Sequence, residues 1–213
     1  MTRRWTIKGQ IPDAPSALQL HEIAKTLTNG AVVLMPTDTV YGLHALALDD
    51  AAVARVAEIK GREDTKPFIV LAASMDQLKP LGICAERNTL EALETLWPAP
   101  LTAILPLDVP IAASRGRRTL ALRIPALDWL RELIARTGPL VSTSANRSGE
   151  PLVERPELLA RDVQERLDGI VDGGVRGGEP STIVDLTSAE PRVLREGEHS
   201  FTQKVWKTLR KSL

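Results

Sequence analysis

Residues 142–149 read Ser-Thr-Ser-Ala-Asn-Arg-Ser-Gly, and they follow the turn Gly138-Pro139 and the apolar pair Leu140-Val141. The apolar pair indicates the end of a buried strand. The hydroxyl and amide side chains that follow supply hydrogen-bond donors and acceptors for a polar ligand. Successive backbone N–H groups in such a turn also form anion-binding nests. Ser, Thr and Asn are equally common at helix N-termini, and for this segment alone a capping cluster is the slightly favoured interpretation.

A second polar segment, residues 60–67, reads Lys-Gly-Arg-Glu-Asp-Thr-Lys-Pro and gathers three cations. The helix macrodipole favours cations near a helix C-terminus, which accounts for Lys60 and Arg62. It does not account for Lys66, which lies beyond the glycine and next to Pro67. Arg offers a bidentate fork and Lys a point charge, so the segment suits a polyphosphate. The sequence has no Walker A loop and no GxGxxG, so a nucleotide would be held by cations and hydroxyls on loops.

Three further polar segments follow apolar runs. Residues 36–43 read Pro-Thr-Asp-Thr-Val-Tyr-Gly-Leu, and by composition a simple loop carries equal weight there. Residues 178–185, Gly-Glu-Pro-Ser-Thr-Ile-Val-Asp, place hydroxyls at the start of a strand. Residues 195–197 read Arg-Glu-Gly.

The apolar pattern predicts alternating helices and strands. Ser16 to Gln19 has the form of a capping box, and the helix that it begins ends at Asn29-Gly30. Further helices are predicted after Asp49, over 86–97, from Leu127, and from Pro156. Predicted strands cover 31–35, 43–48, 68–72, 102–105, 120–124, 170–172, 181–186 and 192–195. Because several connections are too short for helical crossovers, we expect an α/β protein with a mixed sheet.

Composition limits the class of protein. The 213 residues, 43% hydrophobic and with zero formal net charge, fit one globular domain without a general attraction to nucleic acid. Cys84 is the only cysteine, which excludes an intrachain disulfide and a cysteine-only zinc site. The N-terminus lacks the apolar run of a signal peptide, and no stretch is long and apolar enough to span a bilayer. We therefore expect a soluble cytoplasmic protein.

Taken together, the polar segments resemble a known family. Residues 36–43, 60–67 and 142–149 match the YrdC-like threonylcarbamoyl-AMP synthases in order and spacing. Further matches are Trp-Pro-Ala-Pro-Leu-Thr at 97–102, Leu-Ala-Leu-Arg-Ile-Pro at 120–125, and the segments at 180–185 and 195–197. The resemblance covers roughly residues 15–198. The family's signature, a Lys-x-Arg segment answered by a distant Ser-x-Asn segment, is present as Lys60/Arg62 and Ser144/Asn146.

The resemblance implies a twisted mixed sheet flanked by helices around a large, concave, positively charged cleft. It also implies an enzyme, a nucleotidyltransferase that condenses L-threonine, bicarbonate and ATP, with Mg²⁺, to threonylcarbamoyl-adenylate and pyrophosphate. A partner transferase complex would then move the threonylcarbamoyl group to tRNA. Mg²⁺ would be bound through the ATP phosphates, with no metal ligands from the protein.

Roles for individual residues follow from the resemblance and the chemistry. Negative charge builds on the phosphoryl oxygens, so catalysis would be mainly electrostatic and positional. Lys60 and Arg62 are the catalytic candidates. The candidates for ATP binding are Arg62, Lys66, Thr119, Ser144, Asn146 and Arg195. Those for threonine binding are Thr37, Arg123, Ser142, Ser181 and Thr182, with Arg123 on the carboxylate.

Some features depart from the family's pattern. Ala99 and Glu196 replace a usual glycine and a frequent proline, and both are interpreted as tolerable loop changes. Many relatives carry an additional C-terminal domain, whereas here about fifteen residues follow Gly197. We therefore expect the short form, a single domain over 1–213 whose residues 199–213 form an amphipathic basic helix. Packing on its own domain is favoured for this helix over contact with tRNA or a partner.

Two other functions stay open. The same fold serves as an RNA-binding module, although zero net charge, one Tyr and two Phe argue against recognition by stacking. A carbamoyl-transfer relative, like the corresponding domain of hydrogenase-maturation proteins, would need accessory acylphosphatase and zinc-finger segments. The chain has neither the room nor the cysteines for them. A divergent paralogue with weakened activity is also conceivable, but such proteins tend to lose the Ser-x-Asn element.

Overall fold

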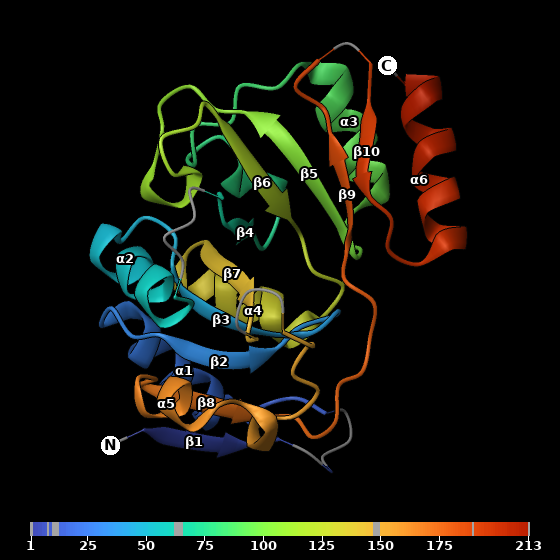
Figure 1. Ribbon diagram of the computed structural model, residues 1–213. Helices are drawn as coiled ribbons and strands as arrows, with labels where there is room; N and C mark the ends of the chain where they lie inside the picture. Colours follow the sequence, from blue (N-terminus) through green and yellow to red (C-terminus); the bar gives the residue numbers. More distant parts are fainter. Residues whose placement is uncertain are drawn as a thin grey trace.

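The computed structural model describes residues 2–7, 9, 13–61, 66–146, 150–188 and 190–212. Its described part contains a mixed sheet of ten strands in the order β1-β8-β2-β3-β7-β4-β6-β5-β9-β10. The strands β1, β8, β2 and β3 cross the lower part of Figure 1, whereas β6, β5, β9 and β10 run steeply through the upper part. The sheet is therefore strongly twisted, and the α/β class with a mixed sheet is confirmed.

The strands are β1 (Arg3–Thr6), β2 (Val33–Pro36), β3 (Tyr41–Leu46), β4 (Ile69–Leu71), β5 (Leu101–Pro106), β6 (Thr119–Arg123), β7 (Leu140–Ser144), β8 (Gly169–Asp172), β9 (Thr182–Asp185) and β10 (Arg192–Arg195). The helices are α1 (Ala17–Thr28), α2 (Asp50–Ile59), α3 (Arg87–Leu96), α4 (Asp128–Thr137), α5 (Arg161–Glu165) and α6 (His199–Ser212). Short 3-10 turns cover Met75–Gln77, Ala112–Ser114 and Pro156–Leu158.

Local sequence signals fix several boundaries. Ser16 accepts a hydrogen bond from the backbone N–H of Gln19, whose side chain bonds back, so the predicted capping box begins α1. Asp49 caps α2 by accepting from the N–H of Ala52. The helix predicted from Pro156 is only a 3-10 turn, and α5 begins five residues later at Arg161.

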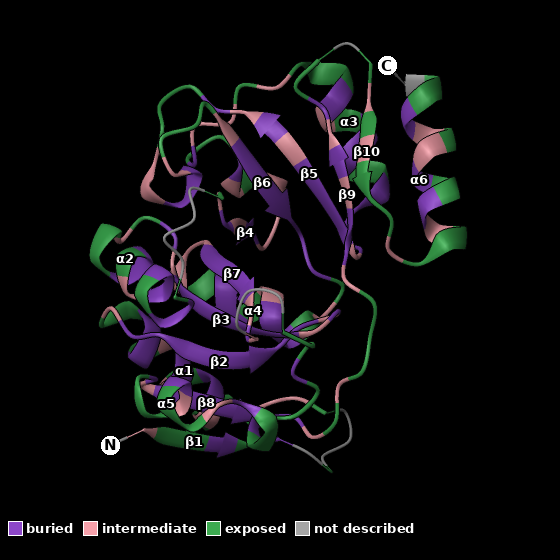
Figure 2. Ribbon diagram, in the orientation of Figure 1, coloured by how far each residue is buried: buried purple, intermediate pink, exposed green. Residues whose placement is uncertain are grey.

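Alternation along the central strands divides the core between the two faces of the sheet. Leu34 and Leu43 belong to a large cluster to which α2, α3 and α6 also contribute. Val33 and Met35 belong to a second cluster with apolar residues of α1 and α4. Successive strand residues point to opposite faces, so both faces of the central sheet are covered. Figure 2 shows the central strands buried and the outer surfaces of the helices exposed.

The hydroxyl residues Ser142 to Ser144 belong to a strand and not to a helix cap. β7 runs through Ser144, antiparallel to both β3 and β4, which places it in the middle of the sheet. The described part of the chain continues from Ser144 to Asn146 without entering a helix. The capping interpretation, which the isolated segment favoured, is therefore wrong. The hydroxyl residues emerge from the centre of the fold, where a ligand site is possible.

Both ends of the described chain extend the fold. β1 pairs in parallel with β8 at one edge of the sheet, although the sequence analysis assigned no strand there. The helix α6 lies at the other end of the molecule beside α3, with Val205 and Leu209 fully buried (Figure 1). Its residues Lys204, Lys207, Arg210 and Lys211 are exposed. Among the described residues, no helix has the length and apolar character needed to cross a membrane.

Candidate ligand-binding site

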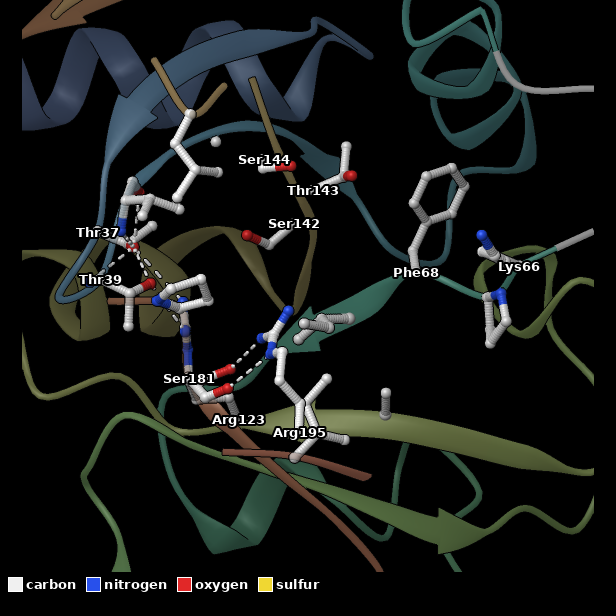
Figure 3. A pocket seen from close by; sticks show the side chains of 18 of the residues that line it. Thr37, Thr39, Lys66, Phe68, Arg123, Ser142, Thr143, Ser144, Ser181 and Arg195 are labelled. Atoms are coloured by element: carbon white, nitrogen blue, oxygen red, sulfur yellow. Dashed lines mark hydrogen bonds between the residues drawn. The ribbon is translucent and has the colours of Figure 1, made fainter. Parts of the chain in front are cut away.

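A cavity of about 380 Å³ lies where β3, β7, β4 and β6 meet the segments before β9 and after β2. Hydroxyl and cationic side chains supply its polar lining: Thr37, Thr39, Lys66, Arg123, Ser142, Thr143, Ser144, Ser181 and Arg195. Figure 3 shows these side chains around a common space, with Arg123 and Arg195 on one side and Ser142 and Ser144 facing them. None of the described residues that line the cavity is a carboxylate, whereas Lys66, Arg123 and Arg195 are basic.

Arg123 is the most tightly held charge in the cavity. It is the last residue of β6 and only 4% exposed, and its guanidinium donates to the Thr39 hydroxyl at 3.0 Å. A longer contact of 3.5 Å reaches the Thr37 hydroxyl, and an ion pair of 3.4 Å reaches Asp38. Burial lowers the pKa of Arg123, and the charge of Asp38 opposes that shift. The Nε atom of Arg123 is buried and has no hydrogen-bond partner among the described residues.

Asp38 is in turn fixed by the backbone. Its carboxylate accepts a hydrogen bond of 3.0 Å from the N–H of Ala126, just beyond the end of β6. The turn after β2 is thereby tied to the end of β6. The Thr37 hydroxyl also accepts from the backbone N–H groups of Thr39 and Val40, which closes the turn on itself. The hydroxyls and the guanidinium are therefore held in place before any ligand binds.

Arg195 is attached at the rim of the same cavity. It is the last residue of β10 and is exposed, and it donates to the backbone oxygen of Ser181 at 3.0 Å and to its hydroxyl at 3.1 Å. The Ser181 hydroxyl lies 2.8 Å from that of Thr102, which continues the chain of hydroxyls into the sheet. Desolvation and the nearby charge of Arg123 both lower the pKa of Arg195. An anionic ligand in the cavity would reduce the repulsion between these two like charges.

His44 stands behind one wall of the cavity. It is fully buried in β3, opposite Ser142 of β7, and its Nε2 lies 3.2 Å from the Ser142 hydroxyl. Burial lowers the pKa of His44 to about 3, and the charge of Arg123 acts in the same direction. The imidazole is therefore neutral at physiological pH.

Lys60 connects the two signature segments. It follows α2 and is 4% exposed, and its ammonium donates to the backbone oxygen of Ser144 at 2.5 Å and to that of Asn146. The side-chain oxygens of Ser144 and Asn146 both lie 3.2 Å from the same nitrogen. Lys60 of the Lys-x-Arg segment therefore meets the Ser-x-Asn segment in space, although the two lie 84 positions apart in the sequence.

The structure brings most of the predicted site residues together. Thr37, Lys66, Arg123, Ser142, Ser144, Ser181 and Arg195 all line the cavity. Lys60 lies next to it through Ser144. Asn146 lines an adjoining hollow of about 300 Å³ that shares Leu152 with the cavity, and its amide donates to the backbone oxygen of Glu150. Arg62 lies outside the described residues.

Besides Lys60 and Asn146, two further predicted residues do not line the cavity. Thr182 is fully buried, and its hydroxyl lies 2.7 Å from that of Thr202 and accepts from the N–H of Gly197, so it joins β9 to α6. Thr119 is the first residue of β6 and pairs with Pro106 of β5. Ala121, two residues further along the same face of the strand, lines the cavity, whereas Thr119 does not. Neither residue contacts the interior of the cavity.

Other residues of the cavity and of its surroundings are not evident from the sequence. The motifs indicate no role for Thr39, Thr143 or His44, and they show Asp38 only as part of a polar turn. The alternation of β3 and β7 places His44 beside Ser142, but that register appears only once the two strands are paired. Tyr41, the chain's only tyrosine, is structural: its hydroxyl donates to the backbone oxygen of Gly174 and accepts from the N–H of Gly173.

A metal bound by the protein alone would need a set of ligands. Within the part of the chain that the structure describes, no three His, Cys, Asp or Glu side chains are grouped to hold a metal ion. The cavity instead offers cations and hydroxyls, which suit the oxygens of a carboxylate or a phosphate. The fold and the site thus define an α/β protein with a cavity near the centre of a twisted mixed sheet, whose polar lining is suited to small anionic ligands.

Comparison with known proteins identifies the family. The Sua5/YciO/YrdC family model, described as "Telomere recombination", matches residues 25–197. The chain therefore belongs to this family.

Individual relatives are close in sequence and structure. Threonylcarbamoyl-AMP synthase of Pyrococcus abyssi is 39% identical over 175 residues, which are 80% of this chain and 52% of the relative. The enzyme of that name from Chromohalobacter salexigens is 38% identical over 186 residues, covering 82% of this chain and 96% of the relative. The crystal structure of P. abyssi Sua5 complexed with L-threonine superimposes with a TM-score of 0.85 at 33% identity, over 96% of this chain and 61% of that one. The chain thus spans about half the length of the Pyrococcus relative and nearly all of the Chromohalobacter one.

Proposed function

We propose that the protein is a threonylcarbamoyl-AMP synthase that makes threonylcarbamoyl-adenylate from L-threonine, bicarbonate and ATP. The observation that carries the proposal is the cavity in which buried Arg123 and exposed Arg195 face the hydroxyls of β7. Two relatives that bear this enzyme's name, at 38–39% identity, support it. So does a related Sua5 structure that contains L-threonine.

The buried side of the cavity suits threonine. The Arg123 guanidinium, already oriented by Asp38 and Thr39, would bind the carboxylate of the amino acid. The hydroxyls of Thr37 and Ser142 would bind its hydroxyl and amino groups. The walls close to Arg123 exclude water, which strengthens the attraction between guanidinium and carboxylate.

The exposed side suits the nucleotide. Lys66 lies across the cavity from Arg123, and Arg195 lies beside Arg123 at the exposed rim; Lys66 and Arg195 would together bind the phosphates of ATP (Figure 3). Lys60 would act indirectly, because its hydrogen bonds hold Ser144 and Asn146 in place. The polar groups of these two residues would then bind the nucleotide. Mg²⁺ would enter as MgATP, bound to the phosphate oxygens, because no carboxylate is present among the described lining residues.

The reaction needs no nucleophilic side chain. The threonine nitrogen bonds to the carbon of bicarbonate with loss of water, which gives a carbamate. A carbamate oxygen then bonds to the α-phosphorus of ATP, and the bond from that phosphorus to the bridging oxygen of pyrophosphate breaks. Negative charge grows on the phosphoryl oxygens and on pyrophosphate, so the fixed cations stabilise the transition state more than the ground state.

Transfer of the product to tRNA by a partner complex, and a cytoplasmic location, complete the proposal. They rest on the resemblance alone. The rival functions have less support: the cavity is a small, walled space, whereas an RNA-binding module would need an extended surface with aromatic side chains for stacking.

The test is pyrophosphate release from ATP and Mg²⁺, with threonine and bicarbonate omitted in turn. Mass spectrometry of the quenched mixture would detect threonylcarbamoyl-adenylate. Release that requires both substrates supports the synthase. No release under any condition, together with tight RNA binding, would contradict it.

A further inference from the structure

His44 has a position that the proposed reaction does not yet explain. It is fully buried, and the cavity-lining side chain that it contacts is Ser142, whose hydroxyl lies 3.2 Å from its Nε2. The two residues are direct neighbours across the antiparallel pair β3–β7, so their side chains lie on the same face of the sheet. His44 itself does not line the cavity, whereas Ser142 does.

The backbone around His44 leaves space for its ring. Gly42, two residues earlier on the same face, has no side chain, and a Cβ there would lie 2.9 Å from the His44 Cε1 and 3.2 Å from its Nε2. Gly42 is opposite Ser144 in the same pair of strands and also lines the cavity. The glycine therefore leaves the space that the imidazole needs beside Ser142.

The charge state of His44 suits this position. The ring carries no charge at neutral pH, because its pKa is lowered to about 3 by burial and by Arg123. A neutral imidazole has one nitrogen that donates and one that accepts, so it makes one directed hydrogen bond to a hydroxyl. It also adds no further cation to a site that already holds Arg123 and Arg195. An apolar side chain would fill the same space at a lower desolvation cost.

We propose that His44 is a positioning residue that holds the Ser142 hydroxyl in the orientation in which it binds the amino-group end of threonine. A serine hydroxyl otherwise samples three staggered rotamers, and the hydrogen turns freely about the C–O bond. The hydrogen bond with Nε2 favours one of these rotamers. The remaining hydrogen-bonding positions of Ser142 then face the cavity in one arrangement, which lowers the entropic cost of binding. This inference rests on the proposed function, because it assumes that threonine binds on the Ser142 side.

The test compares His44→Phe with His44→Gln in the full chain. Phe keeps a flat ring but removes the hydrogen bond, whereas the Gln amide reaches about as far as Nε2. We expect His44→Phe to raise the KM for threonine roughly tenfold, the effect of losing about one hydrogen bond. The KM for ATP should change less than about twofold on the same scale. His44→Gln should restore most of the loss.

A double-mutant cycle separates positioning from packing. If His44 acts through Ser142, His44→Phe combined with Ser142→Ala should weaken threonine binding no more than Ser142→Ala alone. Thr26→Val serves as the control: Thr26 is a buried threonine on α1 whose hydroxyl bonds to the backbone of Glu22, away from the cavity. It should lower the Tm without changing the KM for threonine. Additive effects, or an equal rise in both KM values, would overturn the inference.

Direct binding keeps the two proposals distinguishable. Calorimetric titration with L-threonine alone needs no turnover. If the wild-type protein binds threonine but makes no adenylate, the proposed function fails, and the ratio of threonine affinities between wild type and His44→Phe still decides the role of His44. If the wild-type protein neither binds threonine nor turns over, both proposals fall.

Discussion

The two arginines of the cavity differ in what holds them. Arg123 is buried and is bound by the carboxylate of Asp38 and the hydroxyl of Thr39, whereas Arg195 is exposed and, among the described residues, is hydrogen-bonded to Ser181. A buried charge without a partner is unstable, so Arg123 needs its acidic neighbour even when no ligand is present. An exposed arginine has no such need. The difference indicates a preformed side for a small substrate and an adaptable side for a larger one.

Replacement of Arg123 by methionine should have the largest effect. It removes the proposed carboxylate partner and leaves Asp38 buried without its cation, so we expect threonine binding and adenylate formation to fall by about a hundredfold or more. Stability should fall by roughly 3–5 kcal/mol. Calorimetric titration with threonine and chemical denaturation measure the two losses separately.

A paired variant separates the two losses. Arg123→Met with Asp38→Asn removes the unpaired charge, so stability should largely return while threonine binding stays lost. Recovery of binding in this double variant would show that Arg123 only balances Asp38 and does not bind the substrate.

Lys60 is the next strongest case, since it is buried like Arg123 but bonds mainly to backbone oxygens. Lys60→Met removes charge-assisted hydrogen bonds to Ser144 and Asn146, and we expect turnover to fall roughly 10- to 100-fold, equivalent to about 1.5–3 kcal/mol. Steady-state kinetics on folded protein measures this. Lys79→Met, at an exposed lysine outside the cavity, is the control and should change nothing. A lower Tm with turnover per folded molecule intact would reduce Lys60 to a structural role.

Arg195→Gln should have a smaller and more selective effect. The exposed arginine contributes mainly attraction to the phosphates, so the KM for ATP should rise about tenfold while the affinity for threonine stays within twofold. Raising the salt concentration should weaken ATP binding in the wild type more than in the variant. An equal loss of threonine affinity would remove the distinction between the two arginines.

The last prediction concerns the pH dependence of the protein's stability, and it tests only the buried side of the cavity, where His44 lies. The pKa of His44 is lowered to about 3 in the folded protein, from the ordinary value of 6.5. Below pH 6.5 the unfolded chain therefore binds a proton that the folded protein does not, and stability is lost as the pH falls toward 3. The slope for this one group approaches about 1.4 kcal/mol per pH unit. Denaturation between pH 6.5 and 5 should show a shallower loss in His44→Gln; identical slopes would mean that His44 is protonated in the fold.

Much of the fold was predictable because its signals are local. Caps and apolar periods predicted α1, α2, α3 and α4 to within a few residues, since each depends on neighbours within one or two turns. β1 was missed because Arg3–Thr6 is a short edge strand with three exposed residues and only Trp5 buried, so it becomes a strand only by pairing with β8. Pro156 shows the opposite case. Its sequence signal is typical of the start of an α-helix, but in the folded chain it begins only a 3-10 turn of three residues.

The candidate site, like the fold, has a part that the sequence predicts and a part that it does not. The ordered motifs, and with them most of the cations and hydroxyls that line the cavity, can be identified from the sequence alone, because each of these residue types has a chemistry that can be recognised without its neighbours. Only the tertiary structure decided that Asp38 and Thr39 hold Arg123, that His44 lies behind Ser142, and that Thr182 joins β9 to α6 instead of lining the cavity. Strand register fixes which side chains share a face, and register is set by contacts between residues far apart in the chain. Such contacts leave no local pattern in the sequence.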